Sequence, residues 1–287
     1  MKTTKTTKLL SLGLISLCAL SLGVPTASAA DPKANNKADV KFIEDDGAVD
    51  PEKPEVTDPT DPGTEPQIVD PGGEGGGGNG TRSFNINWIS DFKFGEIKIA
   101  GKSMTAFAQP TTLNWATEED GDLTPTGDKT VGLANFLQVT DNTGKNSGWN
   151  VQVKGTPFYE LDAQGEKIEA NTLAGATITL AEPQVVGLAE SADLAPTSPL
   201  AADKDILDGA FNPVFRAATE KGQGTWSLTW GAESDKTTLK GITIAGDTAT
   251  GKATSGVKLT VPVTAKPKAN KSYRSNLEWV LTTAPGS

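Results

Sequence analysis

The sequence lacks histidine altogether and contains a single cysteine, Cys18, among its 287 residues. Cys18 lies inside an N-terminal apolar stretch that we expect to be removed, so the mature chain carries neither residue type. Such a chain cannot form disulfides, a thiolate nucleophile, a Ser-His-Asp triad or a zinc site built from His and Cys. Most familiar catalytic chemistry is therefore excluded.

The N-terminus predicts a secretory signal peptide over residues 1–29. Three lysines form its positive region: Lys2, Lys5 and Lys8. The apolar stretch 9–24 follows, and residues 27–29, Ala-Ser-Ala, fit a small-residue cleavage site. A transmembrane anchor is the alternative, but the apolar run is short and contains Ser and Gly. A lipoprotein is not favoured, because Leu17 occupies a position where a lipobox needs a small residue. We expect secretion without a membrane anchor.

Positive charge is scarce. The chain has 26 basic and 36 acidic residues, a formal net charge of −10. Cleavage would remove three of the lysines and no acid, which leaves 23 basic against 36 acidic residues, or −13. Nucleic acid is a poor partner for such a chain, because binding to phosphates requires a basic surface. The acidity also has the ordinary role of keeping a secreted protein soluble.

Aromatic side chains are almost missing between residues 31 and 80, where Asp, Pro, Glu and Gly dominate. Such a segment is expected to bury too little apolar surface to fold. Its Asp-Pro and Glu-Pro steps favour extended conformation, and the glycines of 72–80 predict a flexible joint. The carboxylates lack a loop that would bring them together around calcium. We predict a disordered Asp/Pro/Gly-rich linker over residues 30–81.

The folded part is predicted to span residues 82–287 as one domain, with two small domains as the alternative. No convincing amphipathic helix is found, and short segments with period-2 alternation recur between turn signals. The expected strands are 84–88, 92–99, 176–180, 225–230, 242–245, 256–263 and 277–281. Short antiparallel strands with long loops predict an all-β sandwich or barrel.

Two further local patterns concern the middle of the chain. Segments 136–139 and 149–153 alternate apolar and polar residues on either side of a polar loop, which predicts a β-hairpin. Residues 190–213 form a long insertion that contains Ala, Asp and Pro, with a helical turn expected around 201–207.

Two tryptophan-containing segments stand out, GTWSLTWG at 224–231 and YRSNLEWVLTTAP at 273–285. Alternate residues of a strand share a face, so each segment presents a row of large apolar side chains. The rows are Trp226, Leu228 and Trp230, and Leu277, Trp279 and Leu281. Such rows usually pack into a core. The other interpretation is a partly exposed aromatic ledge that stacks on sugars, and the sequence does not separate the two.

The Trp-x-Leu of residues 226–228, followed by the distal Tyr-x-x-x-Leu-x-Trp-x-Leu of 273–281, resembles the WxL domain of Gram-positive surface proteins. The signal peptide, the Asp-Pro-rich spacer and the Asp-Phe-x-Phe-Gly pattern of 91–95 agree with that family. Glu278 departs from it, because Thr is more common there. The resemblance marks these residues as a cell-wall-binding motif: Trp226, Leu228, Trp230, Tyr273, Leu277, Trp279 and Leu281.

The resemblance implies a secreted cell-surface protein that binds peptidoglycan non-covalently, alongside other surface proteins of the same gene cluster. The absence of a Leu-Pro-x-Thr-Gly ending fits this expectation. The alternative is an adhesive or protein-interaction component that is held by partner proteins or binds host matrix proteins through loops 190–213 and 141–147. A third hypothesis is a hydrolase with two carboxylates, but the acidic cluster 118–122 is typical of a solvated loop. We therefore expect no enzyme, cofactor or metal.

Overall fold

The computed structural model describes residues 37, 39–72, 75–78, 80–235 and 252–283. The chain divides into two units, Met1–Phe42 and Ile43–Ser287, and the strands described below belong to the second. The predicted signal peptide and the strand predicted over 242–245 lie outside the described residues.

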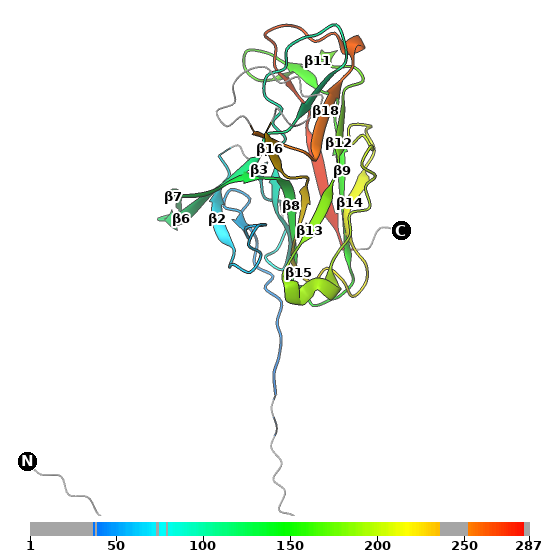
Figure 1. Ribbon diagram of the computed structural model, residues 1–287. Coiled ribbons are helices and arrows are strands. Elements are labelled where there is room, and N and C mark those ends of the chain that lie inside the picture. The colour runs from blue at the N-terminus through cyan, green and yellow to red at the C-terminus, as the bar shows by residue number, and fades with distance from the viewer. Residues whose placement is uncertain (1–36, 38, 73–74, 79, 236–251, 284–287) are drawn as a thin grey trace, which may run out of the picture. The chain divides into compact units, whose positions relative to one another are not determined.

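The described secondary structure is antiparallel strand with two short 3-10 helices, which confirms the predicted all-β class (Figure 1). The strands are β1 Glu55–Val56, β2 Gln67–Asp70, β3 Gly75–Gly76, β4 Phe84–Ser90, β5 Met104–Phe107, β6 Thr111–Glu119, β7 Asp122–Leu133, β8 Asn135–Asp141, β9 Trp149–Gly155, β10 Tyr159–Leu161, β11 Lys167–Thr172, β12 Thr177–Leu180, β13 Pro183–Val186, β14 Asn212–Ala217, β15 Gly224–Trp230, β16 Glu233–Asp235, β17 Lys252–Thr254, β18 Val257–Val261, β19 Tyr273–Arg274 and β20 Leu277–Thr282. The 3-10 helices are η1 Ala189–Leu194 and η2 Val263–Ala265.

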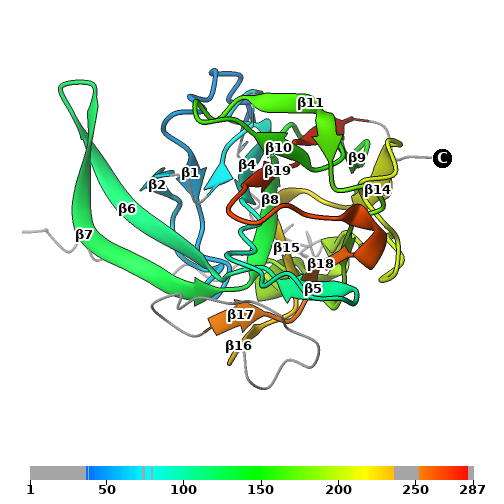
Figure 2. The same ribbon diagram turned by 90° about the horizontal axis from the view of Figure 1, so that it is seen from above.

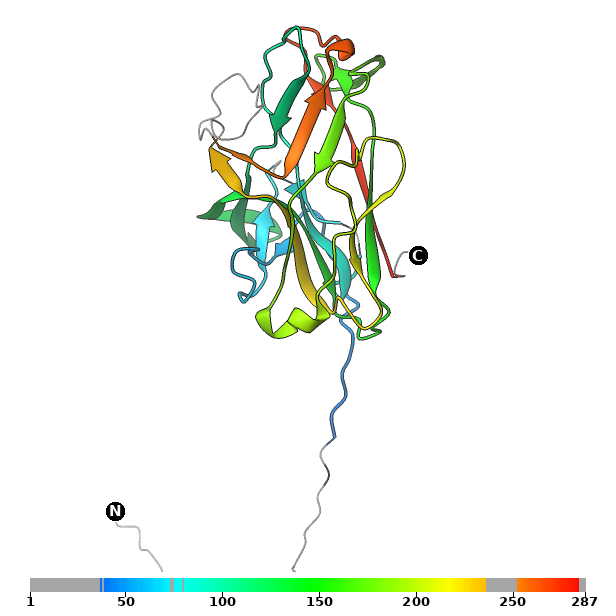
Figure 3. The ribbon, with the colours of Figure 1, turned by 45° about the vertical axis from the view of Figure 1, so that its right-hand side comes forward.

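The centre of the molecule is a β-sandwich. One sheet has the strand order β13-β15-β8-β4-β3 and the other β14-β9-β20, and a third sheet, β12-β18-β5, continues the core at one end (Figures 1 and 3). All three sheets contribute buried side chains to one apolar cluster, for example Leu137, Val151 and Ile178. The inward rows of the alternating strands therefore meet in a single core, as sheet-on-sheet packing requires.

The predicted hairpin over 136–154 is wrong, although both of its strands form. β8 pairs with β15 and β4, whereas β9 pairs with β14 and β20, so the connecting loop crosses from one sheet to the other. Gly148 makes this crossing possible, because its φ is +73° and a Cβ there would lie 2.5 Å from the Ala217 carbonyl oxygen. Trp149 then enters the core and stacks edge-on against Phe215, with ring centroids 4.9 Å apart.

The strand predicted over 92–99 is also not formed, since this segment is irregular. Its aromatic residues contact separate partners: Phe92 packs edge-on against Trp230 at 5.9 Å, and Phe94 against Phe158 at 6.5 Å. Gly95, directly after Phe94, has a φ of +65°, which interrupts extended backbone. In the 190–213 region the 3-10 helix η1 begins just before the insertion, and residues 201–207 form turns and a bridge instead of the expected helical turn.

The linker predicted over 30–81 needs correction where it contains β1 and β2. These strands join β6 and β7 in a further antiparallel sheet that covers the outer face of β4 and β8. Val56 and Val69 are fully buried there, in a second apolar cluster with Trp88 and Phe136. These two valines supply the apolar contacts of an otherwise Asp/Pro-rich stretch, and the side chains they contact belong to strands far along the chain. The compact unit therefore begins near residue 43 and not at 82.

A buried glutamine fixes this outer layer to the sandwich. The Gln138 side chain is 1% exposed, and its Oε1 accepts from the Thr57 amide at 3.0 Å. Its Nε2 donates to the Thr57 carbonyl at 2.8 Å and to the Ser227 hydroxyl at 2.9 Å. The side-chain amide thus reproduces the pairing that a neighbouring strand would provide, and it satisfies backbone groups that would otherwise be buried without partners.

The β6–β7 hairpin extends from this layer, away from the strands of the sandwich (Figure 2). Its tip carries the acidic residues of 118–122, all of which are exposed. Asp120 in the turn adopts a left-handed conformation with a φ of +53°.

Candidate functional site

The first tryptophan row lies in the core. Trp226, Leu228 and Trp230 are 3%, 0% and 1% exposed, on a strand flanked by β13 and β8. The Trp226 indole Nε1 donates to the Gln223 carbonyl at 2.9 Å. Gly187 lies against the same ring, so closely that a Cβ there would be 2.4 Å from it. This row is not an exposed ledge in the folded chain.

The second row lies on an edge strand. β20 pairs with β9, with Trp279 opposite Val153 and Leu281 opposite Val151, and the three apolar side chains of the row are half-buried against the core. Trp279 and Trp230 approach with ring centroids 6.1 Å apart. The structure therefore brings the two parts of the motif into contact, although they are far apart in the sequence.

Tyr273 precedes this row on β19 and is half-buried. Its hydroxyl accepts from the Lys268 amide at 3.1 Å, so the tyrosine fixes the segment that precedes it.

A wide cleft of about 1490 Å³ opens beside the second row. Segment 267–279 lines one side of it, and the end of β4 with residues 91–97 lines another. Tyr273, Leu277 and Trp279 are the motif residues that reach it, whereas Trp226, Leu228, Trp230 and Leu281 do not line it. Both aromatic and charged side chains line the cleft: Asp91, Phe92, Lys93, Phe94, Glu96, Lys268, Lys271, Tyr273, Arg274 and Trp279.

Basic side chains outnumber acidic ones in the lining of the cleft. Four basic side chains, at 93, 268, 271 and 274, line it with two acidic ones at 91 and 96, and the two at 268 and 271 are paired with the Glu160 carboxylate. Amide and hydroxyl side chains, including Asn270, Asn276 and Ser275, lie between them. The sequence carried a signal at the Asp-Phe-x-Phe-Gly pattern of 91–95 and at Tyr273, Leu277 and Trp279, whereas the polar residues of 268–276 occur in a stretch without a pattern.

An ion cluster holds one side of the cleft in place. The Glu160 carboxylate is 2% exposed and lies 2.7 Å from Lys268 Nζ and 3.6 Å from Lys271 Nζ. The hydrogen bond from Lys268 outweighs the burial of this carboxyl and lowers the pKa of Glu160 below its ordinary value of 4.5. The loop before β19 is therefore tied to β10 by a charged contact, and the Leu161 amide also donates to the Ser272 carbonyl at 2.9 Å.

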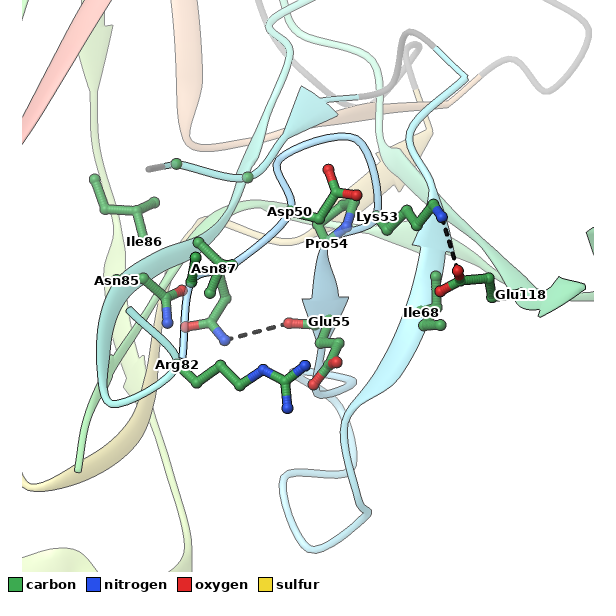
Figure 4. Close-up of a pocket in the computed structure, with 14 residues that line it drawn as sticks. Asp50, Lys53, Pro54, Glu55, Ile68, Arg82, Asn85, Ile86, Asn87 and Glu118 are labelled. Atoms are coloured by element: carbon green, nitrogen blue, oxygen red, sulfur yellow. Dashed lines mark hydrogen bonds and ion pairs between the residues drawn. The ribbon is translucent and has the colours of Figure 1, made fainter. Parts of the chain in front are cut away.

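A second, smaller cavity of about 210 Å³ lies between residues 48–55 and β4 (Figure 4). Lys53 at its side pairs with Glu118 at 3.0 Å, and Asn87 Nδ2 donates to the Glu55 carbonyl at 3.2 Å. The Asn87 Oδ1 is buried without a hydrogen-bond partner. No motif residue lines this cavity, and no sequence pattern pointed to it.

No three carboxylate, histidine or cysteine side chains in the described ranges gather closely enough to hold a metal ion. Over the same ranges, no helix is long and apolar enough to cross a membrane.

A family model described as WxL domain, surface cell wall-binding, matches residues 29–285, which is nearly the whole chain. No curated protein and no solved structure matches this chain significantly.

Proposed function

The chain belongs to the WxL family of surface, cell-wall-binding domains, and from that premise we propose that it is secreted and binds peptidoglycan non-covalently through the wide cleft. The family assignment makes it a cell-surface protein of a cell-wall-binding type, and the family is not one of enzymes. The identity of the wall polymer, the mode of export and the cleft as its binding site are the proposal.

The observation that carries the proposal is the convergence of motif residues and basic side chains on one cleft. Tyr273, Trp279 and Phe92 offer aromatic faces on which the C–H face of a sugar can stack. Arg274 is exposed and suits the carboxylates of stem peptides, and Asn and Ser side chains suit hydroxyl and amide groups. At about 1490 Å³ the cleft exceeds the usual volume of a small-molecule pocket, roughly 300–1,000 Å³, and fits a segment of polymer.

The motif residues then have two roles. Trp226, Leu228 and Trp230 act through the fold, because they are buried and Trp230 contacts Trp279 of β20. Tyr273, Leu277 and Trp279 are the proposed contacts. Leu281 packs on the core beside them without lining the cleft.

The test is co-sedimentation with purified peptidoglycan that is free of teichoic acid. The Arg274→Glu substitution, at an exposed position of β19, should weaken binding about tenfold or more, because a charge-assisted contact becomes a repulsion. Lys129→Glu makes the same change at an exposed position on β7 and should leave binding as it is. Equal binding by both variants would rule out the cleft as the site.

A second candidate function is adhesion or protein interaction, either with other surface proteins or with host matrix. The projecting β6–β7 hairpin favours it, because a long exposed hairpin offers backbone and side chains to a partner. Two results together would support this function over the first. The wild-type protein would stay in solution when mixed with purified peptidoglycan, and it would be recovered by crosslinking from intact cell surfaces.

A further inference from the structure

An apolar segment that precedes the folded strands is exposed. Val40, Phe42 and Ile43 are 79%, 89% and 82% exposed, whereas most of the other described valines and phenylalanines pack inward. Residues 39–43 read Asp-Val-Lys-Phe-Ile, in which Val40 and Phe42 share one face of an extended chain and Lys41 takes the other. This is the pattern of a strand without a sheet.

The chain fixes the C-terminal end of this segment. The Asp45 carbonyl accepts from the Ser83 amide at 3.0 Å, and the Ser83 hydroxyl donates to the Glu44 carboxylate at 2.9 Å. Residues 44 and 45, which follow the segment, are therefore held beside the start of β4.

β20 offers the sheet edge that matches. It is at the end of the order β14-β9-β20, and no described strand pairs with it on the side away from β9. Its sequence, Leu-Glu-Trp-Val-Leu-Thr, contains no proline, glycine or lysine. Straight apolar edges of this kind are the ones that accept a further strand.

Three other edges of the described sheets carry features that block strand addition. β7 contains Pro125 and a left-handed Gly127, and its pairing with β6 shifts register. β13 begins with Pro183, and Thr197 occupies the outer edge of β14 through two hydrogen bonds with Arg216. Proline and bulges are usual means of blocking strand addition, and β20 contains no proline and pairs with β9 without a register shift.

We propose that residues 39–43 of one copy add to β20 of a second copy as an antiparallel strand. With Lys41 opposite Glu278, Val40 comes opposite Trp279 and Phe42 opposite Leu277, so that both apolar faces coincide. Glu278 already pairs with Lys154 on β9 at 2.8 Å, and Lys41 would approach it from the other side. Each copy then carries one donor segment, residues 39–43, and one acceptor edge, β20. Because these two surfaces differ, the interface is heterologous and generates chains or rings of copies. The inference does not depend on the binding of peptidoglycan.

The first experiment is sedimentation velocity of the protein across a range of concentrations. The wild type should associate in a concentration-dependent series. Phe42→Pro removes both an apolar side chain and an amide that would donate toward Leu277, and it should raise the dissociation constant at least about tenfold. Lys37→Pro is the matched control outside the pairing segment and should associate as the wild type does. A wild type that stays monomeric, or a Phe42→Pro variant that associates normally, would overturn the proposal.

A second experiment identifies the acceptor and uses Cys18→Ser chains, which contain no other cysteine. Lys41→Cys and Glu278→Cys are made in separate chains and mixed under mild oxidation. A heterodimer linked by a disulfide is expected, because residues opposite each other in a ladder have Cβ atoms about 4.5–5.5 Å apart. Lys41→Cys mixed with Asp203→Cys, an exposed turn position, is the control and should crosslink far less.

Two results of the second experiment would contradict the proposal. Equal crosslinking in both mixtures would show that the exposed segment associates non-specifically. Closure of a disulfide within single chains that carry both Lys41→Cys and Glu278→Cys would show that each copy covers its own edge. Because no peptidoglycan is present, either result leaves the proposed function to be judged separately.

Discussion

At the scale of single residues, Gln138 links two layers with one side chain. It lies on β8 and satisfies both backbone groups of Thr57, which belongs to a stretch of very low apolar content. A leucine there would match the apolar character of the strand, yet it would leave the Thr57 amide and carbonyl buried without partners. The sequence around Gln138 shows nothing of this, because the partner lies 81 positions away.

We expect Gln138→Leu to lower the free energy of unfolding by about 3 kcal/mol, since each unsatisfied buried backbone group costs roughly 1–3 kcal/mol. Equilibrium denaturation in urea measures this. Gln184→Leu, at an exposed position of β13, is the control and should change stability little. If Gln138→Leu lowers the free energy of unfolding as little as the control does, the Thr57 amide and carbonyl must find other hydrogen-bond partners.

The Glu160 cluster predicts a dependence on pH. The folded-state pKa of this carboxyl is lowered from 4.5, mainly by the hydrogen bond from Lys268, so its contribution to stability is fully present above about pH 4.5. The contribution is lost as the pH falls through the lowered folded-state pKa. Glu160→Gln should therefore melt at a lower temperature than the wild type at pH 7, and the difference should shrink in acid. Thermal unfolding of both proteins at several pH values tests this, and a constant difference would contradict it.

At the scale of elements, the two tryptophan rows differ because their strands differ in position. β15 has a strand on each side, whereas β20 is an edge strand whose row is only half covered. The same alternating pattern therefore produces a core row in one case and the side of a cleft in the other. Contact between Trp230 and Trp279 joins the two, so damage to the first row also displaces the second.

Substitution of each row should have different effects. Trp226→Ala should cost about 3–5 kcal/mol of stability, because it empties a buried site, and any loss of wall binding should follow loss of structure. Trp279→Ala should leave a folded protein that binds peptidoglycan more weakly. Near-UV circular dichroism and co-sedimentation separate the two effects, and full binding by a folded Trp279→Ala protein would exclude that side chain as a contact.

β4 explains why strand patterns alone mislead. Ile86 and Trp88 are two positions apart and should share a face, but the ladder with β8 shifts register between them. Ile86 joins the main cluster and Trp88 the second one, on opposite faces of the sheet. The bulge thus allows one strand to contribute to both cores.

At the scale of the whole molecule, the second core makes the N-terminal stretch part of the folded unit. A chain that begins at residue 82 lacks Val56 and Val69 and exposes their partners, among them Trp115. Compared with a chain that begins at residue 43, it should lose at least about 3 kcal/mol of stability, at roughly 1.5–3 kcal/mol for each buried valine. Urea denaturation and binding of a hydrophobic dye measure this, and equal stability of the two chains would show that the outer layer is dispensable.

The sequence by itself determined the all-β class, most of the strands and the family, because alternation assigns each residue of a strand to a face and the tryptophan spacing is a local pattern. It also marked Tyr273, Leu277 and Trp279, which line the cleft. Only the tertiary structure decided that β8 and β9 belong to different sheets, that Val56 and Val69 are core residues, and that loop lysines line a cleft beside the motif residues. The physical reason is that a local pattern fixes which way a side chain points, whereas its partner is selected by burial and hydrogen bonding summed over residues distant in the sequence.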